Sequence, residues 1–81
     1  MRFALIVEQA KQNWAAYVPD VPGLGITAPT LEAVLSAAQE ALAFHIEGML
    51  LNQETIPQPQ TPITGYAVEV DLEAITQAIA S

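Results

Sequence analysis

The sequence predicts an α+β domain in which one long helix packs on a mainly antiparallel sheet. Three observations support this fold class. Segments before residue 30 alternate apolar and polar side chains with the period of strands. A proline-free, helix-forming run then fills residues 31–52, and a further alternating segment follows a proline-rich stretch. The expected order is therefore strand, strand, strand, helix, strand, helix, with a helix covering one face of the sheet.

The first half of the chain contains the signals of three strands. Residues 2–7 (RFALIV) alternate and are rich in β-formers, the polar residues 8–13 predict a turn, and residues 14–18 alternate again, so that an antiparallel hairpin is expected. The two prolines of VPDVPG cannot donate to a strand ladder, so the second strand should stop there. Residues 24–28 (LGITA) favour a short third strand more weakly.

The central helix is the best-defined element, with Thr30 as its N-cap and a span of residues 31–52. At 100° per residue its apolar positions form one stripe, made of Leu31, Val34, Leu35, Ala38, Leu42, Ile46 and Met49. We expect Leu31, Leu35, Leu42 and Ile46 to be buried against the sheet face carrying Phe3, Leu5 and Val7, or against its reverse. A flanking stripe of Ala33, Ala37, Ala41, Phe44 and Gly48 either allows close packing on a second side or reflects helix propensity alone.

The last third of the chain returns to the sheet. Residues 53–64 (QETIPQPQTPIT) contain three prolines and predict an extended connector. Residues 66–70 alternate as a fourth strand, and Asp71 is placed to cap a short helix whose apolar positions are Leu72, Ile75 and Ile79.

Length and composition favour one folded domain over residues 1–81. The chain has 81 residues, of which 52% are hydrophobic and 14% charged, and this balance excludes intrinsic disorder. A small chain with this much apolar content has too few polar side chains to cover its surface. We therefore expect a homo-oligomer, at least a dimer, or an obligate partner. No apolar run reaches the length of a membrane span or of a signal-peptide core, and there is no cysteine, so a cytoplasmic location without membrane contact is the default.

The side chains that could act as bases or metal ligands do not form a catalytic pattern. His45 is the only imidazole and is interpreted as a packing histidine rather than a base or metal ligand, because no nucleophile accompanies it. The remaining candidate ligands are interpreted as solvated charges without diagnostic spacing; they are Glu8, Asp20, Glu47 and Glu69. The prediction is a protein without enzymatic activity, catalytic residues, metal or other cofactor.

Charge favours a protein partner over nucleic acid. The net charge is −7, with only Arg2 and Lys11 as cations, whereas affinity for phosphates comes mostly from lysine and arginine. Trp14 and Tyr17 lie three residues apart in an alternating strand, so one should face the core and the other outward as an interface candidate. We therefore expect a basic protein partner and no direct nucleic-acid binding.

From Tyr17 to Pro59 the motifs follow a specific order. The sequence reads YVPDVPG, then a short strand, then TLEAVLSAAQEAL from Thr30 to Leu42, and finally IPQP from Ile56. This order resembles the HicB-like antitoxins along almost the whole chain. The resemblance implies a partly degraded RNase H-like fold without nuclease activity. It also implies a HicA-type toxin as partner, a small basic protein with a double-stranded-RNA-binding-like fold that cleaves mRNA and is masked by the antitoxin.

Two departures from the family pattern bear on this hypothesis. Ala28 and Pro29 stand where the family often has Gly-Asp before the helix cap, and only one short helix follows Val70, so we expect no appended DNA-binding domain. Two alternatives stay open: an orphan interaction domain without a toxin, and a metal-dependent RNase H-like hydrolase. The candidates for the partner interface are Trp14, Tyr17, Asp20 and Phe44.

Overall fold

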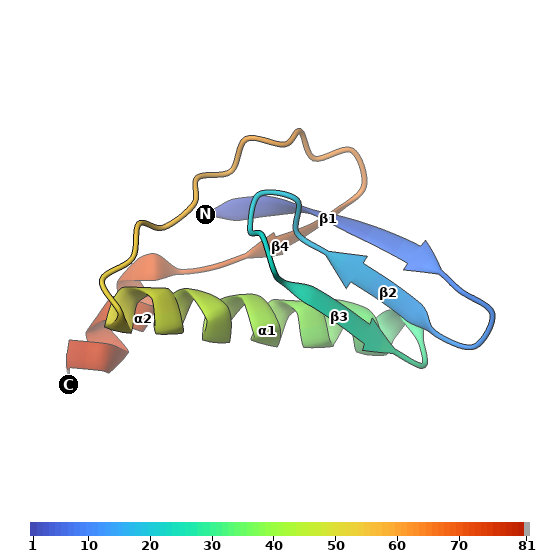
Figure 1. Cartoon of the computed structure of the whole chain (residues 1–81), viewed down its shortest axis with the longest axis horizontal. Coiled ribbons are helices and arrows are strands. Elements are labelled where there is room, and N and C mark those ends of the chain that lie inside the picture. Colours follow the sequence, from blue (N-terminus) through green and yellow to red (C-terminus); the bar gives the residue numbers. More distant parts are fainter. Residues whose placement is uncertain (81) are drawn as a thin grey trace.

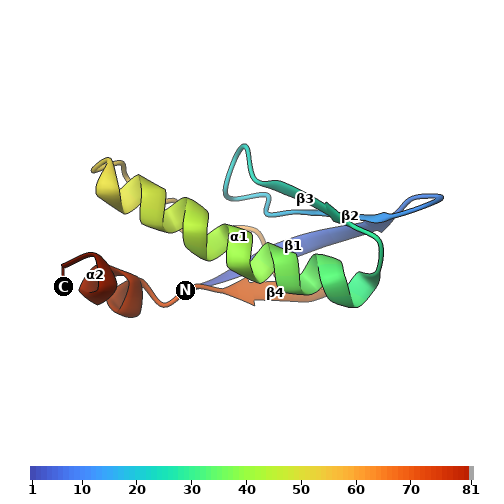
Figure 2. The ribbon, with the colours of Figure 1, turned by 90° about the horizontal axis from the view of Figure 1, so that it is seen from below.

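The computed structural model describes residues 1–80, and the expected element order is confirmed (Figure 1). The elements are β1 (Arg2–Gln9), β2 (Trp14–Tyr17), β3 (Gly25–Ala28), α1 (Leu31–Leu51), β4 (Tyr66–Glu69) and α2 (Leu72–Ala80). The α+β class and the antiparallel sheet are also as predicted, whereas likeness to RNase H stays a prediction. α1 lies along one face of the sheet, with α2 beside its C-terminal half (Figure 2).

The sheet has the spatial order β3-β2-β1-β4, and every neighbouring pair is antiparallel. β1 extends two residues further than predicted, because Glu8 pairs with Ala15 and Gln9 with Trp14, which continues the ladder into the expected turn. Only the segment between Gln9 and Trp14 remains to reverse the chain.

The core lies between α1 and the inner face of the sheet. Four helix residues spaced by four are buried against the strands: Val34, Ala38, Leu42 and Ile46. Phe3 and Leu5 meet them from β1 as expected. Leu31, Leu35 and Val7 are only half-buried, contrary to the prediction, because one residue per turn points at the centre of the sheet and its neighbours pack at the border.

Side chains cap both helices where the sequence predicted caps. The Thr30 hydroxyl accepts the Ala33 backbone N–H at 3.1 Å, and the Asp71 carboxylate accepts that of Ala74 at 3.0 Å. The outer edge of β4 is also occupied, because the Gln39 amide of α1 bonds both the carbonyl and the N–H of Glu69. This contact prevents another strand from pairing there.

α1 ends in a Schellman motif that the sequence did not reveal. The Glu54 N–H donates to the Met49 carbonyl at 2.9 Å, and the Gln53 N–H donates to that of Leu50 at 3.2 Å. Gln53 has a φ of 58°, a left-handed conformation that glycine normally supplies. The motif fixes the backbone of Glu54 against the last turn of α1.

Gln53→Gly is expected to raise the free energy of unfolding by about 0.5 to 1 kcal/mol, because glycine adopts this φ without the Cβ penalty. Urea unfolding of both proteins at one concentration measures the difference. Gln53→Ala is the control: it keeps the penalty, so it should not stabilise the protein. Equal stabilisation by alanine would contradict a role for the left-handed backbone.

Candidate interaction surface

The described residues contain no cluster of three or more potential metal ligands among their histidines, aspartates and glutamates. None of their helices is long and apolar enough to cross a membrane. The side chains that stand out are instead exposed apolar groups, which can mark an interaction surface, with carboxylates beside them.

Asp20 is engaged within the chain. Its carboxylate accepts the backbone N–H groups of Gln60 and Thr61, both at 2.9 Å, and the Thr61 hydroxyl, also at 2.9 Å. These bonds join the VPDVPG loop to the proline connector, which arches over the side of the sheet away from α1 (Figure 1). Asp20, one of the four interface candidates, therefore holds the connector in place.

This network should make connector anchoring dependent on pH. The Thr61 and Gln60 backbone donors, and more weakly the Thr61 hydroxyl, lower the pKa of Asp20 despite the opposing effect of desolvation. Because the folded-state pKa is depressed, the stabilisation is complete above the unfolded value of about 3.9 and is lost as pH falls through the folded value. Hydrogen exchange at the Thr61 amide should accelerate, relative to intrinsic exchange, over that acidic range.

The matched variant is Asp20→Asn, which keeps the shape of the side chain and removes its charge. In this variant the relative protection at Thr61 should be low at neutral pH and should not change further on acidification. A wild-type protection factor that stayed constant through the acidic range would contradict the assignment.

Trp14 and Tyr17 lie on opposite faces of the sheet, as the alternation predicted. Trp14 is half-buried and packs against the core between the sheet and α1. Tyr17 pairs with Ile6 of β1 and leaves 43% of its surface exposed on the outer face. Of these two interface candidates, Tyr17 is the accessible one.

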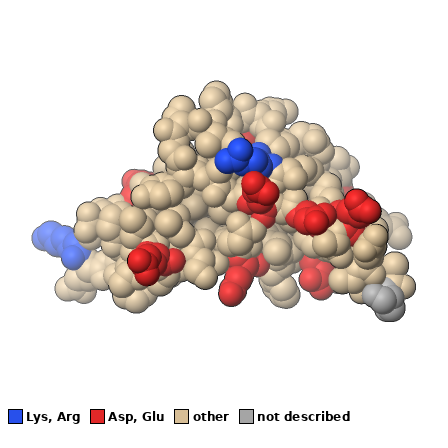
Figure 3. All heavy atoms as spheres, turned by 180° about the vertical axis from the view of Figure 1, so that it is seen from behind, with Lys and Arg blue, Asp and Glu red and all other residues tan. Residues whose placement is uncertain are grey.

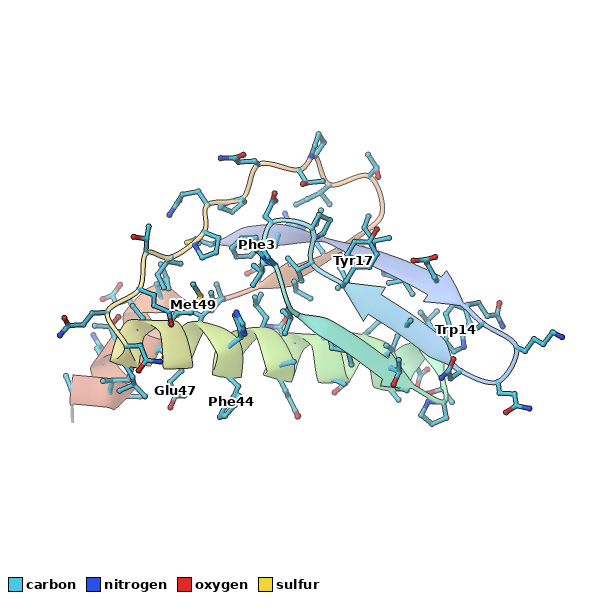
Figure 4. The ribbon with its side chains drawn as sticks, viewed as in Figure 1. Phe3, Trp14, Tyr17, Phe44, Glu47 and Met49 are labelled. Atoms are coloured by element: carbon cyan, nitrogen blue, oxygen red, sulfur yellow. The ribbon has the colours of Figure 1, made fainter. Side chains whose placement is uncertain are left out.

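Phe44 is the most exposed large hydrophobic residue that the structure describes. The ring is 78% exposed and points away from the sheet (Figure 4). Leu51, two helical turns further along the same side of α1, is 59% exposed. Leaving two large apolar side chains in water on one helix side is typical of a binding surface.

Carboxylates flank this apolar pair. Glu40 lies one turn before Phe44 and Glu47 nearly one turn after it, so both share its side of α1, and both are exposed. Figure 4 shows Glu47 beside Phe44 on the side of α1 away from the strands. From behind, acidic side chains are scattered along the lower part of the molecule, where the helices lie, and the two cations are far apart (Figure 3).

An open hollow adjoins Phe44 at the C-terminal end of α1. Its volume is about 270 Å³, and it is lined by Phe44, His45, Gly48, Met49, Asn52 and Glu54. Small-molecule sites usually enclose about 300 to 1,000 Å³. The hollow is slightly smaller than this range and is open to solvent.

The sequence pointed to part of this surface only. Phe44 was a candidate, but Leu51 was missed, although its spacing of seven residues from Phe44 places it on the same side of the helix. Asn52 lies four residues after Gly48, so helical spacing alone could have placed it on the same side. Glu54 could not have been found, because only the Schellman motif brings it against Met49. His45 lies half-buried in the wall of the hollow.

Comparisons with known proteins place the chain in a family context. Residues 3–81 match the model of the HicB-like antitoxin of bacterial toxin–antitoxin systems. An uncharacterised 14.9 kDa protein of Haemophilus phage HP1, from the rep-hol intergenic region, is 38% identical over 66 residues. The match covers 82% of this chain and 49% of that protein, so the chain spans about half the length of its curated relative.

Two solved structures share the fold. A chain of the HicA3 and HicB3 toxin–antitoxin complex has a TM-score of 0.71 at 24% identity, over 88% of this chain and 99% of that one. The crystal structure of the Burkholderia pseudomallei antitoxin HicB has a TM-score of 0.77 at 22% identity, over 90% of this chain and 65% of that one.

Proposed function

The chain belongs to the HicB-like antitoxin family, and from this membership we propose that it is a non-enzymatic antitoxin of the cytoplasm that neutralises a small basic HicA-type toxin. Neutralisation would occur by masking the active or RNA-binding surface of the toxin. The observation that carries the proposal is the family match over residues 3–81, supported by the fold shared with a chain from a HicA3–HicB3 complex. The net charge of −7 is complementary to a basic partner.

The test uses the small basic protein encoded by the adjacent reading frame, co-expressed with this chain. Capture of that protein should be accompanied by loss of its mRNA cleavage. Association should be steered by charge, so on-rates should fall steeply with added salt while the off-rate changes little. A captured toxin that still cleaves mRNA would contradict neutralisation, and absence of capture would favour the orphan interaction domain.

DNA should behave in the opposite way. Two cations per chain cannot offset nine carboxylates against a phosphate backbone, so this chain alone should not shift its own promoter in a mobility assay. Sequence-specific retardation without a toxin would show a DNA-reading surface that this proposal lacks. The hydrolase alternative is tested by incubating the purified chain with RNA and Mg²⁺ or Mn²⁺, where no cleavage is expected.

Self-association is also part of the proposal. The exposed large apolar side chains that the structure describes do not share one face: Phe44 and Leu51 lie on α1, whereas Tyr17 lies on the outer face of the sheet. One partner on α1 would leave the sheet face uncovered, which supports a second contact between copies of the chain. Sedimentation equilibrium at micromolar concentration should show at least a dimer, and a species of only 8.6 kDa would exclude it.

A further inference from the structure

We infer that the hollow beside Phe44 receives a lysine or arginine side chain of the basic partner, with the Phe44 ring as the apolar anchor and the Glu54 carboxylate as the counter-ion. This inference rests on the proposed function and specifies where and how the partner is held. It assigns the α1 surface, rather than the exposed sheet face around Tyr17, to the toxin.

The lining of the hollow matches a long cationic side chain. Phe44, Met49 and the bare backbone at Gly48 supply apolar surface, while His45, Asn52 and Glu54 supply polar groups. Lysine and arginine carry an aliphatic stem that packs on apolar surface and a charged head that stays with polar groups. The exposed Phe44 ring can also attract the cation by its face.

The fold of the free chain does not explain why a glycine, Gly48, lies inside α1. Glycine inside a helix is less favourable than alanine, yet a Cβ at this position would meet no atom within 4 Å. Neither close packing nor an unusual backbone requires it in the chain itself. A partner side chain lying against the backbone would require it, because a methyl group there would fill the floor of the hollow.

The charges in and near the hollow favour a basic protein over a second copy of this chain. Glu54 lines the hollow, and Glu40 and Glu47 lie beside Phe44 on the side of the ring away from the hollow. No lysine or arginine belongs to α1. A copy docking by the same helix side would bring two sets of these carboxylates together, which opposes association. A basic partner instead gains attraction from the same groups.

The experiment measures the affinity of the basic protein from the adjacent reading frame for wild-type chain and for Phe44→Ala, Gly48→Ala and Glu54→Gln. Phe44→Ala should weaken binding roughly 30-fold, as expected for an aromatic hot spot. Gly48→Ala should weaken it about tenfold while raising the thermal midpoint of the free chain, because alanine is the better helix former. Glu54→Gln should weaken binding about tenfold and reduce its salt dependence.

Matched controls lie on other faces. Ile63→Ala removes an exposed apolar side chain from the connector, and Glu8→Gln changes the net charge as Glu54→Gln does. Both should keep the affinity within about twofold of wild type. If wild type binds and the Phe44 and Gly48 variants bind equally well, this inference is overturned and the proposed function survives. If wild type does not bind, both fall.

Discussion

Phe3→Ala is expected to lower the free energy of unfolding by about 3 to 5 kcal/mol, the usual cost of removing a buried phenylalanine. Phe3 is 0% exposed and packs in the core cluster between β1 and α1. A domain of 81 residues holds only about 4 to 12 kcal/mol in total. The variant should therefore be close to unfolded at 25 °C, and denaturant unfolding at a fixed protein concentration measures the loss.

The chain offers its own control in Phe44→Ala, the same substitution at a side chain that is 78% exposed. Alanine is a good helix former and no cavity arises, so stability should change by less than about 0.5 kcal/mol. If Phe3→Ala is too unstable to measure, Phe3→Leu gives a smaller loss of the same sign. Similar losses at Phe3 and Phe44 would contradict the assignment of one ring to the core and the other to the surface.

Local chemistry made much of the fold predictable from the sequence. Thr30 and Asp71 were expected as helix caps because their side chains can accept backbone N–H groups one turn ahead, and both do. The strand segments were visible in the alternation of residues 2–7 and 14–18, since the period of a strand with one buried face is two. Features of this kind depend on neighbours within a few positions.

Individual polar contacts between distant segments were not predictable. Asp20 bonds to Thr61, 41 residues later in the sequence, and Gln39 bonds to Glu69, 30 residues later. No periodic pattern in the sequence indicates either contact. The exact boundary between buried and exposed helix residues was also not predicted. Whether Leu35 is buried depends on how the sheet is positioned against the helix. The same holds for Gln53, whose left-handed backbone occupies a position where the expected residue is glycine.

The candidate site was only partly predictable for a related reason. The stripe that contains Phe44 and Gly48 had two interpretations, close packing or helix propensity, and the sequence could not decide between them. In the structure β3 runs beside the N-terminal half of α1, while the C-terminal half extends past it (Figure 1). Phe44 lies in this C-terminal half and points away from the sheet, so no element of the described chain covers its ring.

Leu42→Ala is expected to lower the free energy of unfolding by about 2 to 5 kcal/mol, as for other buried leucines. Leu42 is 0% exposed at the centre of the buried side of α1, with Ala38 and Ile46 on the turns before and after it. Alanine keeps the helix propensity, so the loss reports the cavity and the lost apolar contact alone. Urea unfolding followed by circular dichroism measures it.

Leu51→Ala is the matched control on the opposite side of the same helix, where the side chain is 59% exposed. It should change the free energy of unfolding by less than about 0.5 kcal/mol. A loss below about 0.5 kcal/mol at Leu42 would mean that α1 meets the sheet by another side. The expected contrast has a functional consequence. Because Leu51 and Phe44 contribute little to folding, their apolar side chains are free to be retained for a partner, and substitutions there can change binding without changing the fold.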